Sequence, residues 1–278
     1  MPVAIVTDSA AALPADLVDR YGITVVPMWL TIDDRPVREG EVSTAELLAH
    51  RNVTTSGPTP GEFEAAVKER LGDEGVCVLT IAATMSSTHE AAELGARAAG
   101  GAVRVVDTRT AAGAQALVVL AAAEAAARGA DLDAVVRAAR TAIDEVRLVA
   151  SVPNLDHLVR SGRVPNIAGW AGRRLGLAPL FEFREGHAHA LRPARGIDAA
   201  YERIIMRCRR DRVAGARLHV AALHALAPEA ASTLLERVRE EFDPATAFAE
   251  PFGTVMVVHT GPGLVGLAWR WEVRRAGR

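Results

Sequence analysis

Two hydroxyl-rich segments and one distant histidine are the residues of this sequence whose types and spacing could hold an acid. Thr55 and Ser56 lie in the first segment, Ser86 and Ser87 lie in the second, and His259 stands near the C-terminal end. Both hydroxyl segments precede expected helices, whose first backbone N–H groups lack intrahelical partners and favour an anion. If the three segments meet, their hydroxyls, amides and imidazole form a pocket that suits a carboxylate.

The same side chains leave two other functions open. Ser86 and His259 could be the nucleophile and the base of an esterase or thioesterase, although the serine lacks the flanking glycines of a nucleophile elbow. A sensor of a small acidic metabolite would use the same polar groups without a long apolar cavity. Asp8, after the first predicted strand, is expected to cap the next turn, with a ligand or a phosphoryl acceptor as alternatives. We favour a binding protein without catalytic residues.

The composition excludes several classes of protein. The 278 residues are 50% hydrophobic and carry a formal net charge of −2, which argues against a nucleic-acid binder. The two cysteines have no partners at the spacing of a disulfide framework or a metal site. The sequence contains no phosphate-binding loop with a lysine, so we expect neither an ATP site nor a cofactor. Without a basic N-terminal region or a membrane-length apolar run, the expected location is the cytoplasm.

The first half of the chain alternates short β-branched runs with longer helical patterns. Strands are expected at 3–6, 24–31, 76–81 and 103–107, and helices at 14–21, 43–50, 61–71, 87–99, 111–128 and 131–145. This alternation is typical of a mostly parallel sheet flanked by helices. Ser43, Thr59 and Ser87 each precede a glutamate by three residues, which predicts three capping boxes.

From about residue 148 the pattern changes to a mixed α+β type. The expected elements are a strand at 148–152, a short helix at 154–161, a hairpin at 180–184 and 187–192, helices at 197–212 and 228–241, strands at 217–223 and 254–258, and a last helix from Pro262. The basic run 207–212 is expected to be a solvated face, with partner docking or membrane contact as the alternative. We therefore expect an α/β fold of two domains, residues 1–150 and 151–278, with a ligand between them.

Short motifs along nearly the whole chain resemble those of the DegV family. They are Val6–Ser9 with Leu13-Pro14, Gly22–Pro27, Thr55–Phe63, Met85–Thr88, Val106–Thr108, Leu155–Leu158 with Ser161–Arg163, and His259–Gly263. The resemblance implies a bacterial fatty acid-binding protein whose acyl chain is buried between two α/β domains. It also implies a partner, since several members present the fatty acid to a separate ATP-dependent kinase that phosphorylates the carboxyl group. Gly57, Ser87 and His89 depart from the family pattern, which has glutamine, glycine and tyrosine there.

The resemblance assigns roles to particular residues. The implied carboxylate contacts are Thr55 or its neighbour Ser56, Ser86, His259, Thr260 and Gly261, and the implied arginines near the head group or the kinase-docking surface are Arg163 and Arg195. The implied ligand is a long-chain fatty acid, with a fatty acid kinase subunit as partner and a transient membrane surface as an open alternative. At about 0.8 kcal/mol per buried CH₂, a sixteen-carbon tail contributes on the order of 10 kcal/mol before ordering costs. We therefore expect an elongated apolar void behind the pocket.

Overall fold

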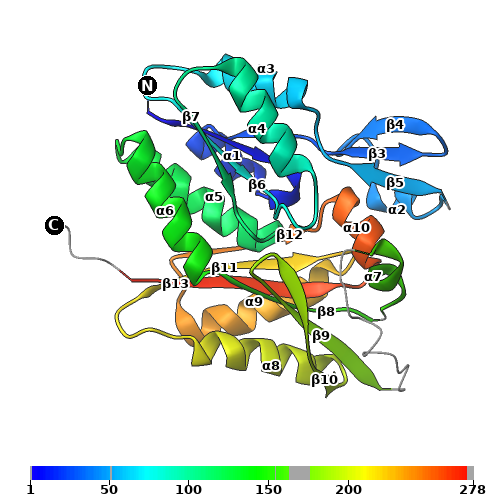
Figure 1. Cartoon of the computed structure of the whole chain (residues 1–278). Coiled ribbons are helices and arrows are strands. Elements are labelled where there is room, and N and C mark those ends of the chain that lie inside the picture. Colours follow the sequence, from blue (N-terminus) through cyan, green and yellow to red (C-terminus); the bar gives the residue numbers. More distant parts are fainter. Residues whose placement is uncertain (1, 51, 154, 163–175, 274–278) are drawn as a thin grey trace.

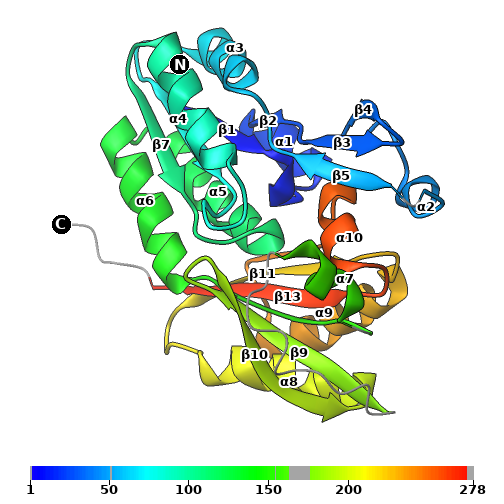
Figure 2. The ribbon, with the colours of Figure 1, turned by 45° about the vertical axis from the view of Figure 1, so that its right-hand side comes forward.

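The structure is a computed structural model that describes residues 2–50, 52–153, 155–162 and 176–273. Figures 1 and 2 show a parallel sheet with its helices stacked on a larger mixed sheet. A small antiparallel sheet extends to one side of the parallel sheet, and its strand β5 (Val53–Ser56) contacts helix α10 (Thr254–Thr260). The predicted α/β fold is confirmed.

The first sheet is parallel throughout, in the order β2-β1-β6-β7. Its strands are β1 (Ala4–Asp8), β2 (Thr24–Val26), β6 (Val76–Thr80) and β7 (Val103–Asp107). Every residue of β1 and β6 is buried, as expected for strands that are covered on both faces. The helices of this part are η1 (Ser9–Ala11), α1 (Ala15–Tyr21), α3 (Pro60–Arg70), α4 (Thr88–Ala99), α5 (Ala112–Ala127) and α6 (Leu132–Glu145).

The second sheet is mixed, in the order β10-β9-β8-β13-β11-β12. Its strands are β8 (Arg147–Ser151), β9 (Leu177–Arg184), β10 (His187–Arg195), β11 (Arg217–His224), β12 (Thr246–Pro251) and β13 (Val265–Glu272). The predicted hairpin is confirmed, because β9 and β10 pair on either side of the two-residue link 185–186. The helices are α7 (Asp156–Ser161), α8 (Ile197–Arg210), α9 (Pro228–Phe242) and α10.

The small sheet, in the order β4-β3-β5, is a feature that the sequence reading missed. It consists of β3 (Trp29–Ile32), β4 (Arg35–Arg38) and β5, with the short helix α2 (Thr44–Leu47) before β5. The predicted strand 24–31 is divided at Pro27, which has no N–H group to continue a ladder, so β3 leaves the parallel sheet. The first hydroxyl segment, Thr55 and Ser56, lies on β5, which pairs with β3.

Helix α5 lies between the two larger sheets and contacts β1, β11 and β13. It is apolar on all sides, which is typical of a buried helix, and nearly all of its residues are buried. Gly113 allows the close approach to β11, since a Cβ atom there would lie 2.8 Å from the Ala221 Cβ. One hydrophobic cluster joins residues of both sheets. The division at residue 150 stays a prediction, and β8, which spans that point, pairs within the second sheet.

All three predicted residues are the N-caps of their helices, but only Thr59 forms the complete capping box that was predicted for each of them. Thr59 forms a complete capping box with Glu62, and Ser43 accepts the N–H of Glu46. The predicted box at Ser87 is wrong, because its side chain makes no capping hydrogen bond. The hydroxyl of Ser86 accepts the Thr88 N–H at 3.3 Å instead.

The prediction for the last part of the chain is reversed. Residues 254–258, predicted as a strand, belong to helix α10, and the helix predicted from Pro262 is strand β13. Tertiary contacts override the β-branched composition of α10, since Glu39 accepts the N–H of Val255 in its first turn. Gly261, at φ +74°, ends the helix in a conformation that favours glycine.

A buried histidine in the second sheet makes the fold acid-sensitive. His219 lies on β11 within hydrogen-bond distance of Thr246 and Glu272. Burial, followed by the positive charge of Arg270, lowers the pKa of His219 to about 4. The unfolded chain binds this proton near pH 6.5, whereas the folded protein binds it only near pH 4. The contribution of neutral His219 to the free energy of unfolding is therefore fully present above about pH 7. It falls by about 3 kcal/mol as the pH drops from about 6.5 to 4.

We expect His219→Gln to lose less stability between pH 7 and pH 5 than the wild-type protein loses, because the replacement has no proton to bind. The measurement is the free energy of unfolding in urea at the two pH values. His189→Gln, at an exposed position on β10, is the control. If the free energy of unfolding depended equally on pH in the two variants, His219 would not be the source of the acid sensitivity.

Candidate functional site

The three predicted segments meet at one cavity of about 240 Å³, called here the hydroxyl–histidine pocket. It is bordered by the end of β5, the loop between β6 and α4, and helix α10, together with one residue before β3. The lining residues are Met28, Thr55, Ser56, Gly57, Ile81, Met85, Ser86, Ser87, Val255, Met256 and His259. Four predicted site residues thus lie together, and their role as ligand contacts stays a prediction.

A hydrogen bond joins the most distant members of the pocket. Thr55 Oγ1 and His259 Nε2 lie 2.9 Å apart, although 204 positions separate them in the sequence. Thr55 is the third residue of β5, and His259 stands in the last turn of α10. Both side chains are half-buried, so their polar atoms are accessible from the cavity.

The second hydroxyl segment has its own local hydrogen bonds. Ser86 Oγ lies 2.7 Å from Thr88 Oγ1 and accepts the Thr88 N–H. The imidazole Nε2 of His259 is bonded to Thr55 instead of Ser86. This arrangement supplies hydrogen-bond donors to an anion more readily than it supplies a nucleophile activated by a base.

Glu39 holds the helix that carries the histidine, and the sequence reading missed it. Its carboxylate accepts the Val255 N–H at 2.8 Å and the Thr254 hydroxyl at 3.4 Å, at the start of α10. Ser9 also donates to this carboxylate and accepts the N–H of Met28, which lines the pocket. The contact joins segments more than 200 positions apart, so no local motif could have indicated it.

Asp8 positions the loop that carries Ser86. Its fully buried carboxylate accepts the N–H groups of Ile81 at 2.8 Å and Ala10 at 3.0 Å, and an N–H of Gln115 at 3.1 Å. Burial raises the pKa of Asp8 to about 6, against the lowering effect of these donors. The predicted cap of the following turn is confirmed. Because the protein's own N–H groups occupy both oxygens, the carboxylate has a structural role here.

The two hydroxyl segments touch at Gly57. A Cβ atom at this position would lie 2.4 Å from Thr88 Oγ1 but 3.4 Å from the Thr88 Cα and Cβ atoms. The absence of a side chain therefore allows β5 and the start of α4 to approach each other. Gly57 and Thr88 each lie two residues from a hydroxyl of the pocket, Thr55 and Ser86, so a change at this contact would displace both hydroxyls.

We expect Gly57→Ala to weaken ligand binding about tenfold, because the new methyl group forces the two hydroxyl segments apart. In a Thr88→Ala background the same change should cost much less, since the clashing oxygen is gone. A double-mutant cycle of dissociation constants measures this coupling. Strictly additive effects would show that the contact does not shape the pocket.

The remaining predicted site residues lie elsewhere. Thr260 is buried and donates to the Met256 carbonyl at 3.1 Å, and Gly261 caps α10 with its Cα against the His157 ring. Neither lines the pocket, so the structure gives them helix-ending roles. Arg195 is exposed at the end of β10 and lies outside the pocket lining. Arg163 lies outside the described residues.

The cavity at the predicted head-group position is small, and the expected elongated apolar void behind it stays a prediction. The pocket volume of about 240 Å³ is below the roughly 300–1,000 Å³ of pockets that bury a drug-sized ligand. Three of the five methionines line it: Met28, Met85 and Met256. Because methionine is unbranched and changes rotamer readily, these side chains can move to admit a longer ligand.

The described part of the chain contains no cluster of metal-binding side chains, and its two thiols are buried. No three His, Cys, Asp or Glu side chains are grouped there to hold a metal ion. Cys77 and Cys208 are buried, and burial raises the pKa of each thiol to about 12, which makes them poor nucleophiles at neutral pH. Among the helices described, none is long and apolar enough to cross a membrane.

The chain is similar over nearly its whole length to proteins of one family. Residues 2–272 match the family model described as "Uncharacterised protein, DegV family". A DegV domain-containing protein of Streptomyces coelicolor is 38% identical over 273 residues, which cover 95% of this chain and 97% of that protein. A Thermotoga maritima protein named fatty acid-binding protein is 28% identical over 278 residues, covering 96% of each. A solved structure, described as fatty acid binding of a DegV family protein from Thermus thermophilus, has a TM-score of 0.91 at 30% identity and covers 98% of this chain and 100% of that one. This chain belongs to the DegV family.

Proposed function

We propose that this protein binds a long-chain fatty acid, with the carboxylate in the hydroxyl–histidine pocket and the tail among the neighbouring apolar side chains. The observation that carries the proposal is the 2.9 Å contact of Thr55 with His259 at a cavity that Ser86 also lines. The similarity to Thermus and Thermotoga proteins named for fatty acid binding supports the same class of ligand.

Each polar group has a role that a carboxylate requires. An ionised carboxylate only accepts hydrogen bonds, so its partners must donate. The bound carboxylate replaces the contact between Thr55 and His259, so that the hydroxyls of Thr55 and Ser86 donate one hydrogen bond each to it and the Nε2–H of His259 donates another. Apolar atoms of Met28, Met85 and other lining residues then contact the tail.

The protein acts as a carrier that presents the carboxyl group to a separate ATP-dependent kinase. Ser56 and Ser87 are exposed residues of the pocket lining, so a carboxylate there is within reach of a second protein. In this proposal the kinase supplies the ATP site, and the carrier contributes no catalytic residue. A transient membrane contact during lipid exchange remains an additional proposal.

Calorimetric titration of the delipidated protein with palmitate and with its methyl ester tests the proposed function. We expect the acid to bind and the ester to bind at least tenfold more weakly, because the ester has no charge for the donors to stabilise. Equal affinities would contradict the assigned role of the pocket. Hydrolysis of a nitrophenyl acyl ester that Ser86→Ala abolishes would favour an esterase instead.

A further inference from the structure

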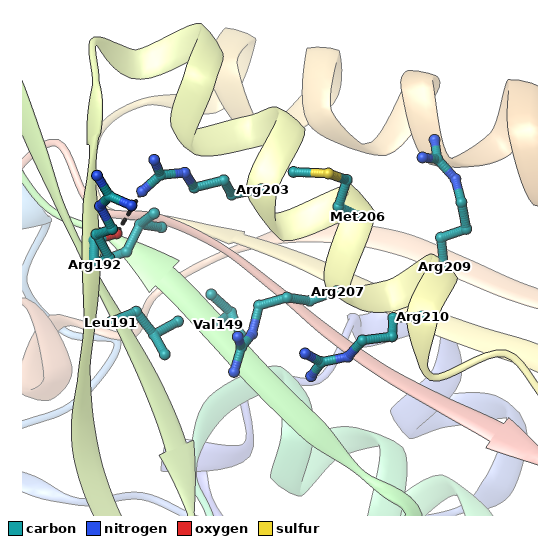
Figure 3. A pocket seen from close by; sticks show the side chains of 9 residues that line it. Val149, Leu191, Arg192, Arg203, Met206, Arg207, Arg209 and Arg210 are labelled. Carbon is teal, nitrogen blue, oxygen red and sulfur yellow. Dashed lines mark hydrogen bonds between the residues drawn. The ribbon is translucent and has the colours of Figure 1, made fainter.

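A second cavity lies on the other side of the second sheet, far from the hydroxyl–histidine pocket. It is a groove of about 660 Å³ between α8 and strands β8, β9 and β10, shown in Figure 3. Val149, Leu180 and Leu191 form its apolar floor, and the first two are almost completely buried. Arginines from β10 and α8 form its rim. We refer to it below as the α8 groove.

The side of α8 that faces the groove carries three arginines and one methionine. Arg203, Met206, Arg207 and Arg210 have the spacing i, i+3, i+4, i+7, which places them on one helix face. Met206 is 50% exposed although it is a large apolar residue. The groove-facing side of α8 thus combines positive charge with accessible apolar surface.

The acidic residues of α8 are directed to its other side. Asp198 and Glu202 both pair with Arg237 of α9, at 3.5 Å and 3.2 Å. Arg209 also turns towards α9, where it binds Glu241. This segregation leaves the groove-facing side of α8 without an acidic side chain of its own helix.

Two arginines bind residues in the walls of the groove, and two others lie at its ends without such contacts. Arg207 pairs with Glu182 of β9 at 2.6 Å, and Arg203 donates to the carbonyls of Arg192 and Pro193 on β10. The guanidinium groups of Arg192 and Arg210 are exposed, and the contact of Arg210 with Asp211 is 3.7 Å long on the surface. Such an exposed pair contributes little. Positive charge therefore remains at both ends of the apolar floor.

We propose that the α8 groove docks an acidic amphipathic helix of a partner protein. Arg192 lies beside Arg203, which binds its carbonyl, and Arg203 is seven residues, about 10 Å along α8, from Arg210; the charges of Arg192 and Arg210 therefore match acidic residues about two turns apart on a second helix. An apolar side chain between those acids would insert beside Met206 onto Leu191. The recessed floor favours a side chain as occupant over a flat bilayer, because a planar surface cannot reach Val149 and Leu180. The α8 groove shares no lining residue with the hydroxyl–histidine pocket.

Fluorescence anisotropy with a labelled amphipathic peptide tests the proposal. The probe is about four helical turns long, with glutamates two turns apart and leucines between them, and its control has glutamines in place of the glutamates. We expect the acidic peptide to bind, with an affinity that falls as salt is added, and the control to bind much more weakly. Arg192→Gln/Arg210→Gln should weaken binding about fivefold to tenfold, and Met206→Gln about fivefold. Arg137→Gln/Arg140→Gln, an equal charge change at exposed positions of α6, should leave it unchanged.

Three results would overturn the proposal. The first is failure of the acidic peptide to bind, and the second is an equal loss in the α6 variant, which would indicate unspecific attraction. The third is that the wild-type protein binds phosphatidylglycerol vesicles but no peptide, and that Arg192→Gln/Arg210→Gln no longer binds the vesicles. This result would assign the α8 groove to a membrane. His259→Ala should bind the peptide like the wild type, so this test is separate from that of the fatty acid site.

Discussion

Replacing His259 by alanine should weaken the binding of a long-chain fatty acid about 10-fold to 100-fold, with little change in the melting temperature of the ligand-free protein. A hydrogen bond to a charged group contributes about 1.5–3 kcal/mol, and every 1.4 kcal/mol corresponds to a factor of ten in affinity. The imidazole is half-buried at the end of α10, so its removal leaves the core intact. Calorimetry and thermal unfolding measure the two quantities separately.

Two threonines of the same strand provide a matched comparison. Thr55→Val removes the hydroxyl that contacts His259 and should weaken binding about tenfold. Thr54→Val changes the neighbouring exposed residue, whose side chain points to the opposite face of β5, and should have no effect. A collapsed fold in His259→Ala, or equal effects of the two threonine variants, would give the histidine and the strand a purely structural role.

Replacing Met256 by tryptophan should reduce palmitate binding at least 100-fold while sparing a short-chain acid such as hexanoate. Met256 lines the pocket and belongs to the hydrophobic cluster that joins the two sheets, so a bulky ring there closes the path of the tail. Each methylene that stays in water forfeits about 0.8 kcal/mol. Calorimetric titration with acids of increasing length shows the length at which the variant and the wild type diverge.

Met256→Leu is the control because it nearly conserves volume and should cost little affinity. Overpacking by tryptophan destabilises a core by about 1–3 kcal/mol, which unfolding of the ligand-free protein detects. Palmitate affinity equal to that of the wild type in a folded Met256→Trp protein would place the tail elsewhere. Weak binding of every acid, irrespective of length, would favour the sensor of a small acidic metabolite.

Much of the fold is predictable from local sequence patterns, because these strands and helices are determined by residues that are close together in the sequence. The buried strands β1 and β6 are continuous apolar runs, and α3 begins at a capping box with Pro60 in its first turn. The alanine-rich α5 was also predicted at nearly its observed bounds. In each case the composition and the tertiary environment favour the same conformation.

Errors occurred where distant contacts decide the conformation. The valines of α10 favour a strand, yet Glu39 binds the start of this segment and Gly261 ends it as a helix. Thr55 and Ser86 were singled out as polar residues before helices, but the close approach at Gly57 and the support from Asp8 depend on residues far away in the sequence. The spacing of charged residues along α8 shows which of them share a helix face. Which face is turned towards α9 and which towards the groove follows only from the positions of α9 and β10.

Mass spectrometry of organic extracts from the denatured purified protein tests the account most directly. Tight enclosure of an apolar tail predicts that fatty acid co-purifies with the wild-type protein and is depleted in Met256→Trp. After delipidation, added palmitate should bind once per chain. If extracts contain no fatty acid and the delipidated protein takes up none, the pocket formed by Thr55, Ser86 and His259 is not a fatty acid site.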